Sequence, residues 1–228
     1  MHKQMRHIIL LGLLLAFTTS CKNHPDPAST KEDSKAKEVK RLLAEAGSLW
    51  IPPSDSTFIL KNDSEHVSIN DKEIWAKLDS ALATDPSNIK VYMGRISYLL
   101  TCKKFYEILP ILRQAEKQTI FNADLWSIKA IFEDYYGDSL IARRNYQSAD
   151  SAYAILIEEH ATDSLSYAAH RMSRALNKAL MTDNFAPFEE EVELTKKVFP
   201  ETWEGADKEF YGKSKKEFYE KFFTTRGK

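Results

Sequence analysis

The segment LDSALATDPSNIKVY, Leu78–Tyr92, decides the fold of this chain. Its leucines and alanines favour a helix, whereas Pro86 cannot stand in a helix interior, because proline lacks the backbone N–H and clashes with the preceding turn. A large aromatic residue, Tyr92, follows six residues after the proline. We therefore predict that one helix ends at Pro86 and that Tyr92 stands at the start of the next.

The same arrangement recurs along the chain at an offset of 34 residues. Ala81 aligns with Ala115, and Ala115 aligns with Ala149. The neighbouring positions agree as well: Leu78, Leu112 and Tyr146; Ile74, Ile108 and Ala142; Tyr92 and Trp126; Ile96 and Ala130. A fixed period of this length indicates an internal repeat.

Residues 123–154 carry this pattern most completely. Spacings of three, four and seven residues place the recurring side chains on one helix face, and alanine there permits a close helix approach that leucine would block. Gly137 and Asp138 mark the turn between the two helices. The recurring positions are Trp126, Ala130, Ala142, Tyr146 and Ala149.

The period and these residue types resemble the tetratricopeptide repeat (TPR). The resemblance implies an all-α fold, a short α-solenoid of helix hairpins over residues 35–228, with the clearest repeats in 71–154 and a C-terminal capping helix in the aromatic segment 206–223. The second repeat departs from the family pattern at three positions. Ile108 replaces a small residue, Lys103 stands where the turn glycine is usual, and Pro110 predicts a kink. A generic helical bundle is the alternative interpretation.

The flanking segments carry weaker signals. Apolar residues in 35–46 have helical spacing, and Gly47 is a plausible stop. Residues 52–70 place Phe58 at the opening aromatic position, but their composition also fits a loop or a short strand pair, and we leave them undecided. Another helix pair is predicted over 164–181 and 187–198, with Asp163 and Asp183 or Asn184 as capping residues, and Pro200 closes it.

The N-terminal residues have the pattern of a targeting segment. A basic start precedes ten apolar residues, too few to span a bilayer, and small residues stand directly before Cys21. This resembles a bacterial lipoprotein signal, which implies removal of residues 1–20 and attachment of lipid, diacylglycerol and palmitate, to Cys21. An ordinary secretory signal cut near Ser20 is the alternative. Residues 21–34 are polar and predict a flexible tether. Lys22 favours the outer membrane, because the residue that causes inner-membrane retention is aspartate.

The sequence offers little chemistry. The formal net charge is -1 and the basic residues form no block, so we expect no nucleic-acid partner. The glycines are scattered and form no phosphate-binding loop. We interpret Cys102 as a buried apolar residue, His160 and His170 as surface residues, and the acidic run 189–193 as a solvated face. We therefore expect no enzyme activity, no metal and no cofactor.

The family resemblance also implies a binding surface. First helices of successive pairs line a concave groove that takes a peptide, and Met93 and Ser97 replace the clamp residues that bind a C-terminal carboxylate in some members. We expect Lys90, Ile131 and Asp134 to be accessible, with Trp126 and Ala130 buried behind them. The positions carried over are Lys90, Met93, Ser97, Asp124, Ser127, Ile131 and Asp134.

The expected function is that of a lipid-anchored adapter in the bacterial cell envelope. It would bind another envelope protein or peptide through the groove and the membrane through the lipid on Cys21. Two alternatives remain open: an immunity-type lipoprotein that neutralises a toxin, and a periplasmic glycan-binding protein or hydrolase.

Overall fold

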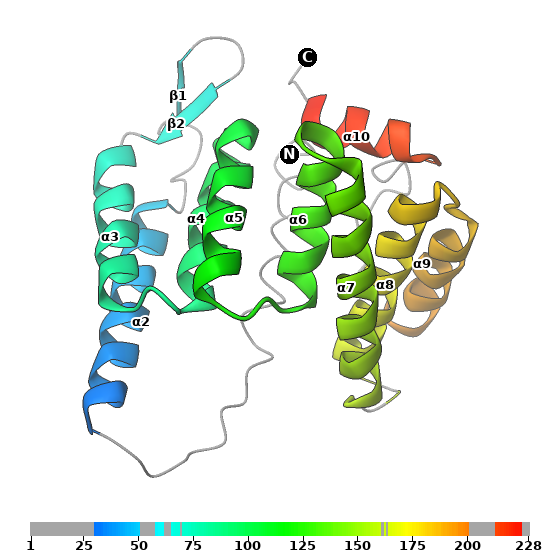
Figure 1. Ribbon diagram of the computed structural model, residues 1–228, viewed down its shortest axis with the longest axis horizontal. Helices are drawn as coiled ribbons and strands as arrows, with labels where there is room; N and C mark the ends of the chain where they lie inside the picture. Colours follow the sequence, from blue (N-terminus) through cyan, green and yellow to red (C-terminus); the bar gives the residue numbers. More distant parts are fainter. Residues whose placement is uncertain are drawn as a thin grey trace. The chain divides into compact units, whose positions relative to one another are not determined.

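The computed structural model describes residues 30–50, 58–61, 65–68, 70–160, 162, 164–200 and 213–224. Helices dominate this part of the chain (Figure 1). Their bounds are Thr30–Trp50 (α2), Asp71–Thr84 (α3), Ile89–Thr101 (α4), Ile108–Gln118 (α5), Ala123–Tyr136 (α6), Ser139–Glu158 (α7), Leu165–Thr182 (α8), Ala186–Val198 (α9) and Lys215–Thr224 (α10). The predicted all-α fold of successive helix hairpins is confirmed.

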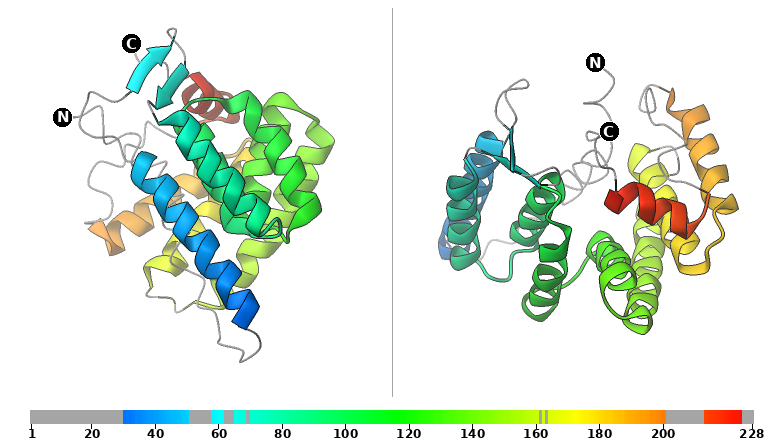
Figure 2. Two further views of the ribbon diagram at one scale, coloured as in Figure 1. Left: turned by 90° about the vertical axis from the view of Figure 1, so that its left-hand side faces the viewer. Right: turned by 90° about the horizontal axis from the view of Figure 1, so that it is seen from above.

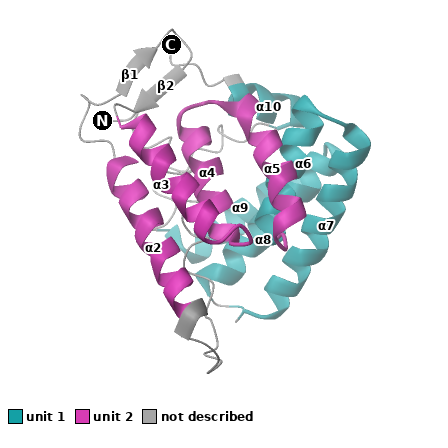
Figure 3. Cartoon of the chain, turned by 60° about the vertical axis from the view of Figure 1, so that its left-hand side comes forward, with its two compact units in different colours: residues 1–20, 122–228 teal, residues 21–121 magenta. Residues whose placement is uncertain are grey.

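The chain forms two compact units, each described here by itself (Figure 3). We call residues 21–121 the N-terminal unit, which contains α2 to α5. We call residues 122–228 the C-terminal unit, which contains α6 to α10; residues 1–20 are grouped with it but lie outside the described residues. The division falls between α5 and α6.

The opening segment of the sequence behaves as predicted. Helix α3 ends at Thr84, Pro86 lies in the turn, and the Asn88 side chain caps α4 by accepting a hydrogen bond from the Lys90 backbone N–H at 3.1 Å. Ala81 is fully buried. It packs with Val39 and Leu42 of α2 and with Val91 of α4, which makes it a tight helix contact.

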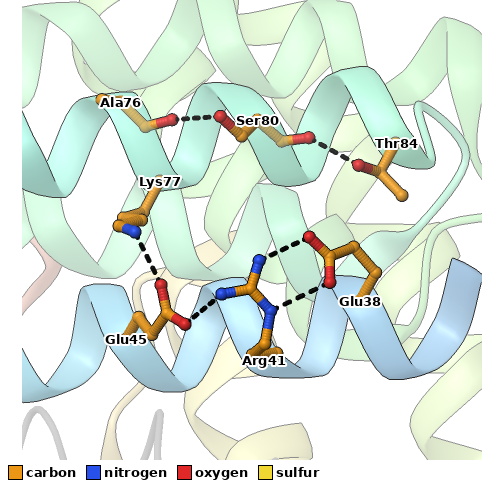
Figure 4. Close-up of polar contacts among 7 residues, drawn as sticks. All are labelled: Glu38, Arg41, Glu45, Ala76, Lys77, Ser80 and Thr84. Carbon is orange, nitrogen blue, oxygen red and sulfur yellow. Dashed lines mark hydrogen bonds and ion pairs between the residues drawn. The ribbon is translucent and has the colours of Figure 1, made fainter.

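Helix α2 lies side by side with α3 in the N-terminal unit (Figure 2, left). Exposed charges join the two helices (Figure 4). Arg41 pairs with Glu38 and Glu45 on α2, and Lys77 of α3 donates to Glu45 at 2.6 Å. Beneath these charges, the core holds Ala46, Ile74, Leu78, Tyr98 and Cys102.

The prediction that Gly47 stops the first helix is wrong. Helix α2 continues to Trp50, because Leu49 and Trp50 pack against the core beyond the glycine. The helix also begins at Thr30, so residues 30–34 of the predicted tether are helical.

The undecided segment 52–70 contains two short strands, one of the interpretations left open. Strand β1, Phe58–Lys61, pairs antiparallel with β2, Glu65–Ser68. Phe58 therefore does not open a helix, and α2 supplies the partner that packs against α3.

The turn between α4 and α5 explains two departures from the repeat pattern. Lys103 has a φ of 56°, in the left-handed region that favours glycine, so the backbone keeps the turn without the usual residue. A 3₁₀ turn, η2 (Phe105–Glu107), leads into α5 at Ile108. Pro110 consequently lies in the first helical turn, where its missing N–H has no partner to lose. The predicted kink within a helix interior is therefore wrong.

The C-terminal unit begins with the hairpin that the sequence marked most clearly. Helix α6 ends at Gly137, and Asp138 caps α7 by accepting hydrogen bonds from the backbone N–H groups of Leu140 and Ile141. Four of the five predicted contact residues are buried, namely Ala130, Ala142, Tyr146 and Ala149, whereas Trp126 is half-buried.

Helices α8 and α9 form the next predicted pair. The residue that caps α8 is Ser164, which accepts a hydrogen bond from the Tyr167 N–H, and Pro187 lies in the first turn of α9. Asp163 lies outside the described residues, and Asp183 instead ends α8 in a left-handed conformation.

The predicted C-terminal helix is present as α10, and it crosses α6 and α7 instead of running beside them (Figure 1). Its contacts reach α6, α7 and the turn after α8.

Candidate functional site

The seven predicted groove residues fall in both units. Three lie on α4 of the N-terminal unit: Lys90, which is exposed, and Met93 and Ser97, which are half-buried. Four lie on α6 of the C-terminal unit: Asp124, Ser127, Ile131 and Asp134. Cys21 lies outside the described residues.

Two of the α6 predictions are wrong. Asp124 is only 6% exposed and Ile131 only 8%, so neither offers a surface to a peptide. The Tyr153 hydroxyl of α7 donates to Asp124 at 2.7 Å, which fixes this carboxylate inside the helix pair. Trp126, expected to be buried, is half-buried beside Ala123 and Ala149. The repeat alignment therefore misplaced the accessible face of α6.

Asp134 lies in a different environment, because side chains of α10 bind its carboxylate. The Tyr219 hydroxyl donates to its carboxylate at 2.6 Å, and the Lys215 ammonium pairs with it. Tyr146 of α7 contributes a longer hydrogen bond of 3.4 Å. Burial raises the pKa of both tyrosines, so each phenol stays protonated and can donate at neutral pH. Asp134 thus anchors α10 to α6.

Aromatic rings surround this anchor. Tyr135 of α6 stacks on Phe223 of α10 at 4.0 Å between ring centroids and 22° between planes. Phe132 meets the edges of Phe222 and Phe223 at 6.2 and 5.3 Å. Such pairs each add roughly 0.5–1.5 kcal/mol beyond the area they bury. The contact between α10 and α6 is therefore mainly aromatic.

Asp183 holds the start of α10. Its carboxylate accepts a hydrogen bond of 2.6 Å from the backbone N–H of Lys215, the first residue of α10, which satisfies one of the unpaired donors at a helix N-terminus. A shallow, open depression of about 450 Å³ lies beside this contact and is lined by Asp134, Lys215, Lys216 and Tyr219 among others.

We call this set of residues the α10 docking site: Phe132, Asp134, Tyr135, Tyr136, Tyr146 and Asp183. Tyr135 and Tyr136 remain 42% and 45% exposed with α10 in place. Of this set, sequence reasoning identified only Asp134 as a site residue. Two adjacent tyrosines just before the turn glycine, and an aromatic stripe near the C-terminus, are the signals that could have indicated the rest.

A second polar cluster lies between α6, α7 and α8. Burial raises the pKa of Asp124 to about 6, although the Tyr153 hydrogen bond acts in the opposite direction. His170 is only 7% exposed, with its ring centroid 5.0 Å from that of His160. Burial and then the charge of His160 lower the pKa of His170. The prediction that His170 lies at the surface is therefore wrong, while His160 is half-buried.

The structure also bears on the predictions for Cys102 and for the acidic run 189–193. Cys102 is fully buried, as predicted, and burial raises the pKa of its thiol to about 11. In the acidic run 189–193, Glu191 pairs with Arg171 of α8, whereas the other glutamates are exposed.

Within the described residues, no group of three or more metal-binding side chains is placed to hold an ion. A search of the same residues found no helix with the length and apolar character of a membrane span.

Comparisons of the chain with protein-family models, with curated proteins and with solved structures found no match.

Proposed function

We propose that this protein is a lipid-anchored adapter of the bacterial cell envelope that binds a partner protein by holding one of its helices. The anchor rests on the sequence around Cys21. The helix-binding part rests on one observation: the C-terminal unit holds an amphipathic aromatic helix, α10, on the surface made by α6, α7 and the turn after α8.

The chemistry of the α10 docking site suits a helix better than a sugar. A glycan-binding platform needs an open aromatic face, but the Tyr135 ring is stacked on Phe223 and meets Tyr136 edge-on, with 80° between the planes. The exposed parts of Tyr135 and Tyr136 instead form a rim beside α10. Aromatic side chains that are partly exposed next to a buried polar anchor are typical of protein contacts.

The binding part can be tested by purification of the anchored protein from envelopes, followed by mass spectrometry of what accompanies it. Tyr135→Ser with Tyr136→Ser should abolish co-purification, because the rim loses its aromatic area. Leu194→Ser with Val198→Ser is the matched control, since these two apolar side chains are also about half exposed, on α9. Loss of the partner in the control but not in the rim variant would move the interaction surface to α9 and refute the proposal.

The anchor has its own test. Metabolic labelling with a palmitate analogue should mark the unaltered protein and leave Cys21→Ser unlabelled. Equal labelling of the two would refute lipid attachment at this cysteine, without bearing on the helix-binding site.

A further inference from the structure

We propose that the α10 docking site is exchangeable: α10 leaves it, and an amphipathic helix of the partner protein with the same side-chain pattern binds in its place. This inference rests on the proposed function and specifies the partner. The required pattern is a lysine, a tyrosine four residues later, and two adjacent aromatic residues three and four positions after the tyrosine.

The pattern follows from which side chains of α10 touch the site. Lys215 and Tyr219 bind Asp134, and Phe222 and Phe223 pack on Phe132. Intervals of four, seven and eight residues from Lys215 place all four side chains on one helix stripe. Any helix that carries this stripe can make the same contacts.

The opposite side of α10 makes little contact with the unit. Glu217 is exposed, and the exposed Lys216 and Glu220 line the open depression beside Asp134 without packing into the unit. The helix has only 10 residues, and its attachment comes from side chains rather than from close approach of the helix backbones. Helices of this length are marginal by themselves in water, so α10 depends on the site for its order. In these respects α10 resembles a bound ligand more than a core helix.

The site itself is built without α10. Its α6 residues are positioned by the close α6–α7 hairpin, whose small residues Ala130, Ala142 and Ala149 are buried. Departure of α10 would expose Phe132, which is fully buried in the docked state, and would leave the Asp134 carboxylate without the Lys215 ammonium. An emptied site is therefore apolar and anionic, and both properties favour a new occupant.

Charge defines which helix can enter. Asp134 binds an ammonium group and Asp183 binds the N–H group at the start of the helix. A partner helix that carried an acid in the place of Lys215 would bring like charges together and be rejected. The preferred partner segment is therefore basic at its N-terminal end and aromatic along the following two turns.

The probe is a fluorescent peptide of residues 213–224 with blocked ends, added to the full chain purified in detergent. Tyr219→Ala with Phe223→Ala weakens α10 in the chain but leaves the docking site intact. We expect this opened variant to bind the peptide at least about tenfold more tightly than the unaltered chain does, because the apparent dissociation constant rises as the open fraction falls. Glu217→Gln, on the exposed side of α10 and outside the lining of the depression, is the matched control and should behave like the unaltered chain.

Two further arms keep the test decisive. Adding Asp134→Asn to the opened variant should reduce peptide affinity by about tenfold, as expected for the loss of a charge-assisted contact. Lys215→Gln removes the ion pair with Asp134 and the cation–π contact with the Tyr219 ring but no packed aromatic side chain, so it keeps the helices folded even if the opened variant does not. It should show a smaller gain in affinity. Absence of peptide binding by both variants, with their helical circular dichroism retained, would overturn the proposal.

The outcome also separates this inference from the proposed function. Peptide binding without any co-purified partner would refute the adapter function and leave the exchangeable site standing. Co-purification of a partner without peptide binding would refute the exchange alone. A third outcome is a dimer in which α10 of one copy occupies the site of the other. A disulfide between Asp183→Cys on one copy and Lys215→Cys on the other would show this dimer. The occupant would then be a second copy, and the proposed partner helix would be wrong.

Discussion

The two units use the same helix hairpins but place their polar groups differently. In the N-terminal unit, the charges that join α2 and α3 lie on the surface, with side chains about one third to one half exposed. In the C-terminal unit, polar side chains lie inside the helix contacts: Asp124 bonds to Tyr153, and Asn177 donates to the Tyr146 carbonyl at 2.8 Å. In the first unit the buried Tyr98 hydroxyl bonds to Asp71, which is only half-buried, whereas in the second unit both partners of the Tyr153–Asp124 bond are buried.

The largest expected effects come from what the units share. Ala115 and Ala149 are both fully buried at equivalent positions of the repeat. Ala115→Leu in the N-terminal unit and Ala149→Leu in the C-terminal unit should each lower the free energy of unfolding by roughly 1–3 kcal/mol, because extra bulk cannot be accommodated in a close helix contact. Denaturant unfolding measures this change. The exposed Ala83→Leu should be nearly neutral, and three equal midpoints would mean that the repeat positions are not equivalent contacts.

A matched pair of hydroxyl deletions tests the difference between the units. Tyr98 donates to Asp71 at 2.5 Å, and Tyr153 donates to Asp124 at 2.7 Å. Asp71 is half-buried and can regain water, but Asp124 cannot. Tyr153→Phe should therefore cost roughly 1.5–3 kcal/mol, and Tyr98→Phe about 1 kcal/mol. A larger loss for Tyr98→Phe would reverse the comparison.

Acid titration sharpens the same point. The pKa of Asp124 is raised from 3.8 to about 6, so the folded chain binds this proton before the unfolded chain does. Between pH 6 and pH 4 this residue should add roughly 1–3 kcal/mol of stability as the pH falls, and Asp124→Asn should lack that gain. His170 acts in the opposite direction. Burial and His160 lower its pKa, so the unfolded chain binds this proton first, and the free energy of unfolding decreases as the pH falls below 6.5. The difference between the unaltered chain and Asp124→Asn isolates the aspartate, and a difference independent of pH would contradict the assignment.

The smallest effect should come from the exposed charges of the N-terminal unit. Lys77→Met breaks the cross-helix pair with Glu45 but keeps the aliphatic stem (Figure 4). Because both side chains are about one third exposed, the loss should be at most about 0.5 kcal/mol and should vanish in high salt. A loss as large as that of Tyr153→Phe would show that surface charge, not apolar packing, holds α2 to α3.

The sequence predicted local packing better than distant contacts. The burial of Ala81, Ala115 and Ala149 could be predicted because each helix packs one face against the next helix in the chain. Helical spacing identifies that face. The same spacing does not say which other face a remote helix covers. Asp134 is captured by α10, some 80 residues later in the chain, and that contact has no local signal. Asp124 is held within the α6–α7 pair by the Tyr153 hydroxyl, and helical spacing did not identify it as a buried residue.

The other wrong predictions concern where a helix begins or ends. Gly47 alone indicated a helix end, but the packing of Leu49 and Trp50 outweighs the cost of one glycine. Pro110 indicated a kink because the repeat pattern places it within a helix, whereas α5 begins at Ile108 and holds Pro110 in its first turn. Both errors concern helix ends, which tertiary contacts shift by several residues.

The central claim is that the α10 docking site binds the partner as it binds α10. The direct test is elution: the partner is captured on the immobilised full chain, and an excess of the unlabelled peptide of residues 213–224 is then added. The account predicts that this peptide releases the partner, whereas the same peptide with alanine in place of Tyr219, Phe222 and Phe223 does not. Retention of the partner at peptide concentrations that saturate the docking site would contradict it.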